Sequence, residues 1–174
     1  MRRLATADRI RAFLARLGGA AREPATAYLT GGSTAVLLGW RDSTIDIDLK
    51  LVPDSVTLLR AIPRLKEELQ VNVELASPDL FIPVPRHWED RSPWETTEGM
   101  LTVRHFDLTA QAVAKLERGH GRDLDDVRAM LDRGLVRREA LLAFLDAIEN
   151  ELYRFPAIDP PSFRRAVEEV ARGG

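Results

Sequence analysis

The stretch that decides the fold runs from residue 44 to residue 52 and reads Thr44-Ile45-Asp46-Ile47-Asp48-Leu49-Lys50-Leu51-Val52. Its apolar residues alternate with polar ones, and this period of two predicts a β-strand with one buried face. The buried face is expected to carry Ile45, Ile47, Leu49 and Leu51. The polar face then carries Thr44, Asp46, Asp48 and Lys50. Two carboxylates placed in this way project from the same face, roughly 7 Å apart along the strand.

A glycine turn precedes this strand. The apolar run over residues 27–30 predicts a strand that ends in a tight turn at Gly31-Gly32. Ser33 is expected to cap a helix over residues 34–40, because its hydroxyl can accept a hydrogen bond from an amide at that end. Such amides favour a phosphate, and glycine lets the backbone approach it without a Cβ in the way. The turn therefore predicts a phosphate-binding element.

Further strands and helices are predicted on both sides of this region. A helix over residues 6–17 is expected to stop at Gly18-Gly19, and a helix over residues 54–69 is expected to be kinked or split by Pro63. Residues 71–75 alternate again and predict a strand whose polar face carries Asn72 and Glu74. Residues 77–93 are rich in proline and predict a long irregular loop, and residues 101–108 predict another strand.

From residue 109 onward the pattern becomes helical. Helices are predicted over residues 111–118, 123–133, 137–155 and 162–171. The fold class predicted is α+β, a small mixed sheet flanked by helices with a C-terminal helical extension. The chain then divides into an α/β core, residues 1–108, and a helical region, residues 109–174.

The composition suits a protein with a sizeable core. The chain has 174 residues, 45% of them hydrophobic, and no cysteine, which excludes disulfide scaffolds, zinc–cysteine sites and thiol nucleophiles. No apolar run reaches the ~18–20 residues of a membrane span, and the basic start has no signal-peptide core. We therefore expect a cytoplasmic protein with no membrane partner.

The formal net charge of −2 excludes a generally basic nucleic-acid binder, although a local basic face remains compatible with it. Arginines gather at both ends of the chain and offer two candidates for such a face. The first set is Arg2, Arg3, Arg11, Arg16 and Arg22, and the second is Arg137, Arg138, Arg164 and Arg165.

The pair of Asp46 and Asp48 is a candidate metal site. Two like charges held this close repel each other, and a divalent cation offsets the repulsion. Carboxylate oxygens suit Mg²⁺, which also binds the oxygens of a nucleoside triphosphate. Lys50 shares their face and is expected to contact phosphate or to pair with the carboxylates. The histidines show no metal-ligand spacing, and neither His105 nor His120 has a visible partner.

Over residues 27–76 this order of motifs resembles the polymerase-β nucleotidyltransferase superfamily. In that superfamily a Gly-Gly-Ser turn is followed, after a helix, by Asp-x-Asp on the next strand. The resemblance implies the nucleotidyltransferase fold, with one or two Mg²⁺ ions on Asp46 and Asp48. It also implies that Gly31, Gly32 and Ser33 position the phosphates, and that a third carboxylate, Glu74, helps to activate the attacking hydroxyl. Aspartate is usual at this third position, where the present chain has glutamate.

The helical region resembles the AbiEii-like nucleotidyltransferases and related uncharacterised bacterial nucleotidyltransferase-like families. The matching stretches are Ala112-Val-Ala-Lys115-Leu-Glu-Arg118 and Arg122-Asp123-Leu-Asp-Asp126-Val127. The resemblance implies that Lys115 and an aspartate of the second stretch, Asp123 or Asp126, complete the active site. Arg118, one turn after Lys115, is then directed at the triphosphate. As alternatives, Asp123 is a helix N-cap and Asp126 pairs with Lys115 or Arg122.

Three hypotheses for function follow from these resemblances. The first is an enzyme that moves a nucleoside monophosphate from an NTP to an acceptor hydroxyl such as a tRNA 3′ end, acting as the toxin of a toxin–antitoxin pair with a cognate antitoxin. The second keeps the chemistry and adenylylates a protein. The third is an inactive nucleotidyltransferase fold that serves as an antitoxin or binding module.

Overall fold

The computed structural model describes residues 2–173, which form two compact units. Unit 1 contains the residues up to Ser77 together with Ser92–Phe106, and unit 2 contains Pro78–Arg91 together with the residues from Asp107 onward. The boundary predicted at residue 108 lies close to this division. The segment Pro78–Arg91, which the sequence prediction placed in the first domain, belongs to unit 2.

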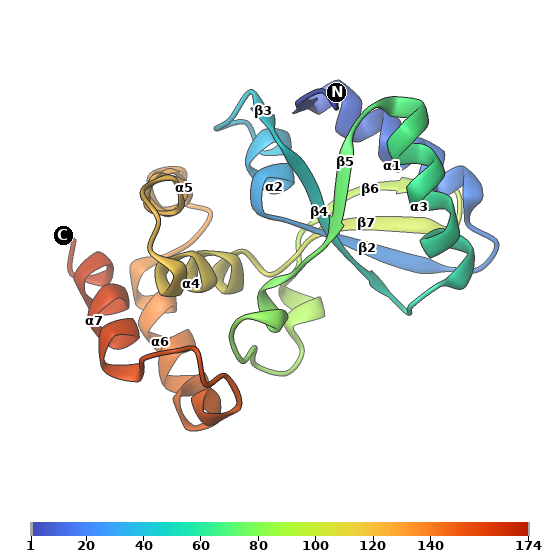
Figure 1. Ribbon diagram of the computed structural model, residues 1–174. Coiled ribbons are helices and arrows are strands. Elements are labelled where there is room, and N and C mark those ends of the chain that lie inside the picture. Colours follow the sequence, from blue (N-terminus) through green and yellow to red (C-terminus); the bar gives the residue numbers. More distant parts are fainter. Residues whose placement is uncertain (1, 174) are drawn as a thin grey trace. The chain divides into compact units, whose positions relative to one another are not determined.

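Unit 1 is built on a five-stranded sheet with the strand order β5-β4-β2-β7-β6 (Figure 1). The strands are β2 (Ala25–Thr30), β4 (Asp46–Val52), β5 (Asn72–Leu75), β6 (Trp94–Glu98) and β7 (Leu101–His105). Strand β2 is antiparallel to β4 and parallel to β7, β5 is parallel to β4, and β6 is antiparallel to β7. The short strands β1 (Ala5–Thr6) and β3 (Ser43–Thr44) pair separately. This mixed sheet with flanking helices is the α+β class that the sequence predicted.

The core of unit 1 lies between the sheet and two helices, α1 (Ala7–Ala20) and α3 (Val56–Leu69), which pack beside each other (Figure 1). Helix α1 contributes Phe13 and Leu17, and β4 contributes Ile47 and Leu49, all with no exposed surface. Because side chains alternate along β4, Asp46, Asp48 and Lys50 project from the sheet face opposite to this core. The alternation predicted for this strand is confirmed from residue 46 to residue 52.

The strand predictions were wrong in some details. Ile45 is 61% exposed, because the chain bends there between β3 and β4 and the alternation begins one residue later. The alternation over residues 71–75 places Leu75 opposite the polar face of Asn72 and Glu74, but Leu75 is exposed at the end of the edge strand β5. Strand β6 was not predicted, since its Trp-Glu-Thr-Thr-Glu sequence shows no buried face.

Two expected helix breakers do not break their helices. Helix α1 continues through Gly18-Gly19 to Ala20, and Gly18 is needed there because a Cβ would lie 2.4 Å from the Cβ of Glu98. Helix α3 runs through Pro63 without a division. The buried residues of α3, among them Leu58 and Leu65, anchor it on both sides of Pro63, so packing outweighs the lost hydrogen bond.

Unit 2 is helical. It contains α4 (Leu108–Arg118), α5 (Gly121–Asp132), α6 (Arg138–Ile148), the 3₁₀ helix η3 (Glu149–Arg154) and α7 (Pro160–Ala171). The single helix predicted over residues 137–155 is therefore an α-helix followed by a 3₁₀ helix. Apolar residues from each α-helix form a core around Val113, Val127, Leu145 and Phe163. Within residues 2–173, no helix is long and apolar enough to cross a membrane.

The proline-rich segment of unit 2 is ordered by Arg91. The segment holds two 3₁₀ helices, η1 (Pro78–Leu80) and η2 (Trp88–Arg91). Arg91 donates from Nε to the buried Asp107 at 2.7 Å and from Nη1 to the carbonyls of Arg86 and His87. Asp107 caps α4 by accepting from the amides of Thr109 and Ala110. One guanidinium thus joins the segment to the start of α4.

Candidate functional site

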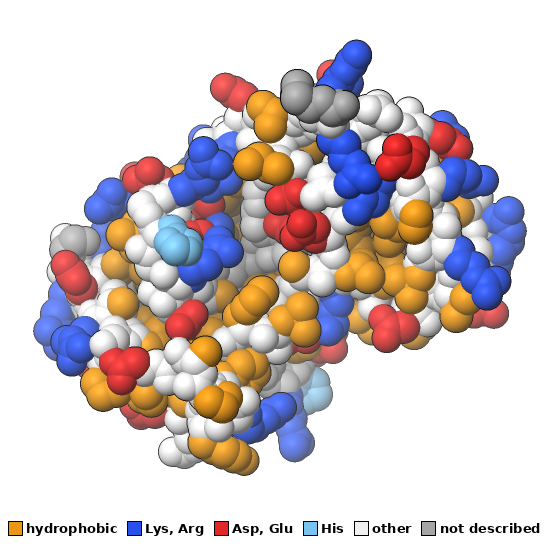
Figure 2. All heavy atoms as spheres, in the orientation of Figure 1, with side chains coloured by type: hydrophobic (Ala, Val, Ile, Leu, Met, Phe, Trp, Pro, Cys, Tyr) orange, Lys and Arg blue, Asp and Glu red, His pale blue; other side chains and the backbone are white. Residues whose placement is uncertain are grey.

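The parallel pairing of β4 with β5 brings three carboxylates and one amide to one face of the unit 1 sheet. The register places Asp46 beside Asn72 and Asp48 beside Glu74. Paired residues on neighbouring strands share a face, and the strands lie about 4.8 Å apart. The predicted third carboxylate, Glu74, therefore lies next to the predicted pair. Figure 2 shows acidic side chains gathered over the region where β4 and β5 run side by side in Figure 1.

Asn72 links these carboxylates, a role that the sequence did not reveal. Its Nδ2 donates to Asp46 Oδ1 and, at 3.4 Å, to Glu74 Oε1. Its Oδ1 accepts from Arg2 at 2.6 Å, and Arg2 also pairs with Glu67 at 2.9 Å. The amide is thereby oriented with its donors toward the acidic face. The period of two in residues 71–75 placed Asn72 on this face, but only the register shows what it contacts.

The two glycines of the turn are required by close approach to neighbouring side chains. Gly31 has φ +59°, and a Cβ there would lie 2.9 Å from Asp48 Oδ2. At Gly32 a Cβ would lie 1.9 Å from Thr44 Oγ1. A Cβ at Gly31 would require the Asp48 carboxylate to move, and a Cβ at Gly32 would displace the turn from Thr44, whose Cβ would lie at 2.6 Å. The turn is thus fitted to the Asp48 carboxylate.

The structure gives Ser33 a different place from the one predicted. Helix α2 (Gly31–Leu37) begins at Gly31 with Thr30 as its N-cap, so the predicted cap at Ser33 and the predicted span 34–40 were wrong. Ser33 lies inside the first turn with no exposed surface, and its hydroxyl accepts from the Asp48 amide at 3.2 Å. Its side chain therefore joins the turn to β4.

The donor set on this face fits a hard cation in its chemistry. Within residues 2–173 no group of three or more His, Asp or Glu side chains is arranged to hold a metal ion. Asp46 and Asp48 nevertheless offer oxygen ligands on half-buried positions of one strand. In the described chain neither Asp46 nor Glu74 forms an ion pair with lysine or arginine. Mg²⁺ is commonly held by one or two carboxylates, with water and substrate phosphates completing its shell, so the pair suits that ion.

The second set of predicted site residues forms a buried ion-pair cluster within unit 2. Lys115 Nζ donates to Asp126 Oδ2 at 2.7 Å and to Asp123 Oδ1 at 3.4 Å. Arg118 binds both oxygens of Asp123, at 2.8 Å from Nε and 2.6 Å from Nη2. Lys115, Asp123 and Asp126 are buried, whereas the Arg118 side chain is 57% exposed. Two cations and two anions make the cluster neutral.

This geometry tests the N-cap and ion-pair alternatives for the two aspartates. Helix α5 begins at Gly121 with His120 as its N-cap, so Asp123 is not an N-cap. Asp126 pairs with Lys115, as one alternative proposed. Burial by itself raises the pKa of Asp123, but the hydrogen bonds from Arg118 and the charge of Lys115 outweigh it, and the net pKa is below the ordinary value. Asp123 is therefore ionised at neutral pH.

A buried histidine supports the glycine turn. His105, for which the sequence showed no partner, lies at 3.0 Å from Thr34 Oγ1 through Nδ1 and at 2.8 Å from Glu95 Oε2 through Nε2. Thr34 lies in the second turn of α2, so the contact ties that helix to β7. Burial lowers the pKa of His105, and the hydrogen bond and charge of Glu95 oppose the shift without reversing it.

Comparisons of this chain with models of known protein families, with curated proteins and with solved structures find no match. Its function is therefore inferred from the residues and geometry described above.

Proposed function

We propose that this protein is a Mg²⁺-dependent nucleotidyltransferase that moves a nucleoside monophosphate from an NTP to an acceptor hydroxyl. The observation that carries the proposal is the register that sets Asp48 beside Glu74 and Asp46 beside Asn72, with the Gly31 backbone against Asp48. Carboxylates next to a glycine turn suit a ligand that combines a cation with a chain of phosphates.

In this assignment Asp46 and Asp48 hold the cation through their oxygens. A bound Mg²⁺ supplies charge neutralisation for the triphosphate and orients it. The Asn72 amide holds Asp46 in place, and the Ser33 hydroxyl holds the Asp48 backbone. The glycine turn offers backbone without Cβ atoms to the phosphates. Lys50, two residues after Asp48 on the same face, adds a cationic side chain for a phosphate or a carboxylate.

The reaction forms one phosphorus–oxygen bond and breaks another. The acceptor oxygen bonds to the α-phosphorus, and pyrophosphate leaves with the electron pair of the bond to the β-phosphate. We assign Glu74 to take the proton of the acceptor hydroxyl, because its carboxylate is exposed and is the neighbour of Asp48 on the next strand. Catalysis then rests on positioning and on electrostatic stabilisation.

The mechanism proposed above does not use the cluster of Lys115, Arg118, Asp123 and Asp126. The resemblance implied that Lys115 and either Asp123 or Asp126 complete the active site, with Arg118 directed at the triphosphate. Each of these side chains is engaged in an ion-pair cluster within unit 2. A Lys115→Met variant that stays folded and keeps full label transfer would remove Lys115 from the reaction.

The test is transfer of label from each of the four α-³²P-labelled NTPs, with Mg²⁺, to total tRNA or to the protein extract of a bacterial host. We expect label on RNA with at least one NTP, and loss of transfer in Asp46→Asn and Asp48→Asn. Asp42→Asn is the matched control, because it makes the same chemical change on an exposed residue of the loop before β3.

The arms of this experiment separate the three hypotheses. Label on protein alone would move the acceptor from RNA to a protein side chain. Transfer that persists in Asp46→Asn and Asp48→Asn would rule out this site. If no NTP labels either acceptor, and no Mg²⁺-dependent NTP binding is measured, the result favours the third hypothesis, a binding module without catalytic activity.

A further inference from the structure

Helices α1 and α3 enclose a surface hollow of about 510 Å³ that lies wholly within unit 1. We call it the arginine groove, and its lining consists of Ala15, Arg16, Gly19, Ala20, Arg22, Thr57, Arg60, Ala61 and Arg64. Every charged residue in this lining is an arginine. In Figure 2 basic side chains gather at the edge of the view that α1 and α3 occupy in Figure 1.

The arginines of the groove keep most of their charge unopposed. Glu68, just outside the lining, pairs with Arg16 at 2.5 Å and with Arg64 at 3.5 Å, so one carboxylate is shared between two guanidiniums. Arg22 donates to the backbone carbonyls of Gly19 and Ala21. Among residues 2–173, Arg60 makes no hydrogen bond or ion pair. The groove is therefore strongly positive although the chain is slightly acidic.

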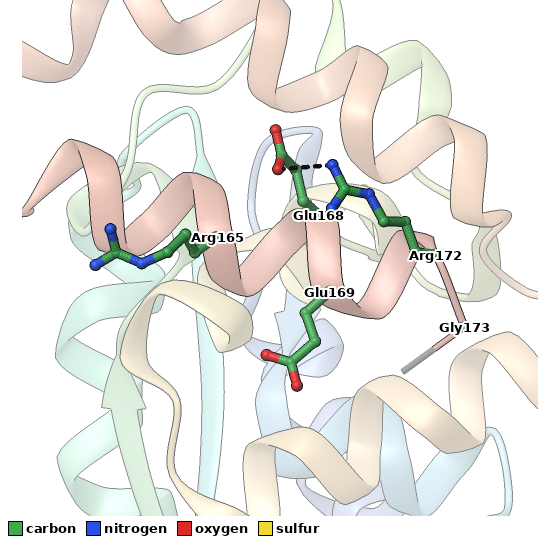
Figure 3. A pocket seen from close by; sticks show the side chains of 5 residues that line it. All are labelled: Arg165, Glu168, Glu169, Arg172 and Gly173. Carbon is green, nitrogen blue, oxygen red and sulfur yellow. Dashed lines mark hydrogen bonds and ion pairs between the residues drawn. The ribbon is translucent and has the colours of Figure 1, made fainter.

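A second hollow, on α7, shows what an ordinary charged surface looks like in this protein (Figure 3). It is of similar size, about 520 Å³, and is lined by Arg165, Glu168, Glu169, Arg172 and Gly173. Arg172 binds Glu168 at 3.1 Å, and Glu169 points away from that pair. Positive and negative side chains balance there, so this hollow has no preference for an anion.

We propose that the arginine groove binds the phosphodiester backbone of a single-stranded nucleic acid. Guanidinium groups bind phosphate through two parallel hydrogen bonds. Arg60 and Arg64 are one helical turn apart, about 6 Å along α3, and Arg16 and Arg22 face them from α1 and its C-terminal end. Four guanidiniums spread along α3, α1 and the segment just after α1 match a chain of phosphates better than one isolated anion.

The uncharged part of the groove lining favours nucleic acid over a lipid surface. It is made of alanine, glycine and threonine, whereas binding to a bilayer surface uses large apolar side chains that enter the acyl region. These small residues leave room for a nucleic-acid backbone between the arginines of α3 and those of α1 and the residues after it. Of the two arginine sets that the sequence offered, the C-terminal one is less suited, because Arg164 pairs with Asp146, Glu149 and Glu168.

The groove does not depend on the proposed reaction. Helices α1 and α3 pack on the core face of the sheet, and Asp46 and Asp48 project from the other face. Nucleic-acid binding is therefore expected without Mg²⁺ and NTP, and it should persist in the Asp46→Asn variant. A failed label-transfer experiment would leave the groove assignment standing, and absence of nucleic-acid binding would leave the carboxylate site standing.

The experiment measures fluorescence anisotropy of a labelled single-stranded RNA oligonucleotide of mixed sequence, titrated with the full-length protein at several salt concentrations. The variant is Arg60→Gln with Arg64→Gln, and the matched control is Arg165→Gln with Arg172→Gln, which makes the same change twice on α7. Loss of two phosphate contacts should make the negative slope of the logarithm of the association constant against the logarithm of the salt concentration shallower by about 1.4. This corresponds to a loss of about 25-fold in affinity at 0.1 M salt. The control should bind like the wild type.

Circular dichroism and thermal unfolding of each variant establish that it is folded. The assignment is overturned if the wild type does not bind the RNA, or if both double variants lose affinity equally. Binding to phosphatidylserine vesicles without binding to RNA would overturn it in favour of a membrane surface. Equal binding to polyglutamate would show that the groove accepts any polyanion and would overturn the assignment to nucleic acid.

Discussion

Replacing Lys115 by methionine tests how far unit 2 depends on its buried ion pairs. Methionine keeps the length and apolar stem of lysine and removes the ammonium. Asp126 then loses a partner at 2.7 Å while its side chain is 2% exposed. Asp123 loses the more distant contact at 3.4 Å and keeps both hydrogen bonds from Arg118. The cost therefore falls mainly on Asp126.

The expected cost follows from removing the ammonium that is hydrogen-bonded to the buried Asp126 carboxylate. Breaking a buried pair by removing one partner destabilises a protein by about 3–5 kcal/mol. Replacing both partners by apolar residues, Lys115→Met with Asp126→Leu, should cost less than Lys115→Met alone, because both charges of this buried pair are removed together. Arg154→Gln is the comparison, since the exposed pair with Glu151 is expected to contribute less than about 1 kcal/mol.

Equilibrium unfolding in urea, followed by far-UV circular dichroism at pH 7, measures each free energy, and an unchanged m value is required for the comparison. The four proteins of the cycle are the wild type, the two single variants and the double variant. A coupling energy of about 2 kcal/mol or more is expected for residues in such contact. A Lys115→Met cost no larger than that of Arg154→Gln, or strictly additive single costs, would refute the reasoning.

Three further predictions concern unit 1. Gly32→Ala should destabilise the protein by about 1–3 kcal/mol in urea unfolding, because its Cβ would meet Thr44 Oγ1 at 1.9 Å, and Thr44→Gly should recover part of this loss. Ser33→Ala should speed hydrogen exchange at the Asp48 amide, measured by NMR, because that amide loses its acceptor. Stability should fall as pH drops below about 6.5, since burial lowers the pKa of His105 and the unfolded chain takes up the proton first. The contribution of His105 to the free energy of unfolding is complete above that pH and is lost as the pH falls toward the lowered pKa of His105 in the folded protein. It should be absent when His105→Gln is unfolded in urea over the same pH range.

Contrary outcomes for these variants are equally specific. An unchanged stability in Gly32→Ala would mean that the turn shifts away from Thr44 at no cost. Unchanged exchange at the Asp48 amide in Ser33→Ala would remove the serine from the support of β4. If the free energy of unfolding of His105→Gln depended on pH as that of the wild type does, the loss of stability in acid would be due to other groups.

Local periodicity was enough to place β4 and its acidic face. The alternation of residues 46–52 depends on neighbours within the strand, and the structure confirms it because one face of β4 covers the core. The same reasoning placed Asn72 and Glu74 on one face of β5. The predicted helix stop at Gly18 was wrong, and α3 is not divided at Pro63, since both residues lie inside helices that packing stabilises. Propensity acts locally, and a buried apolar face can outweigh it.

The contacts between segments were decided by the tertiary structure. The parallel register of β4 with β5 places Asp46 beside Asn72, although the two residues are far apart in the chain. This pairing cannot be predicted from the spacing of residues in the sequence. The burial of Ser33, the pairing of His105 with Thr34 and Glu95, and the meeting of Arg60 and Arg64 with Arg16 across two helices have the same origin. The sequence by itself determined which residue types lie on the two faces of β4 over residues 46–52 and that Asn72 and Glu74 share a face of β5. Which faces meet was determined by the packing of the whole unit, because burial and hydrogen bonding are satisfied between segments that are distant in the chain.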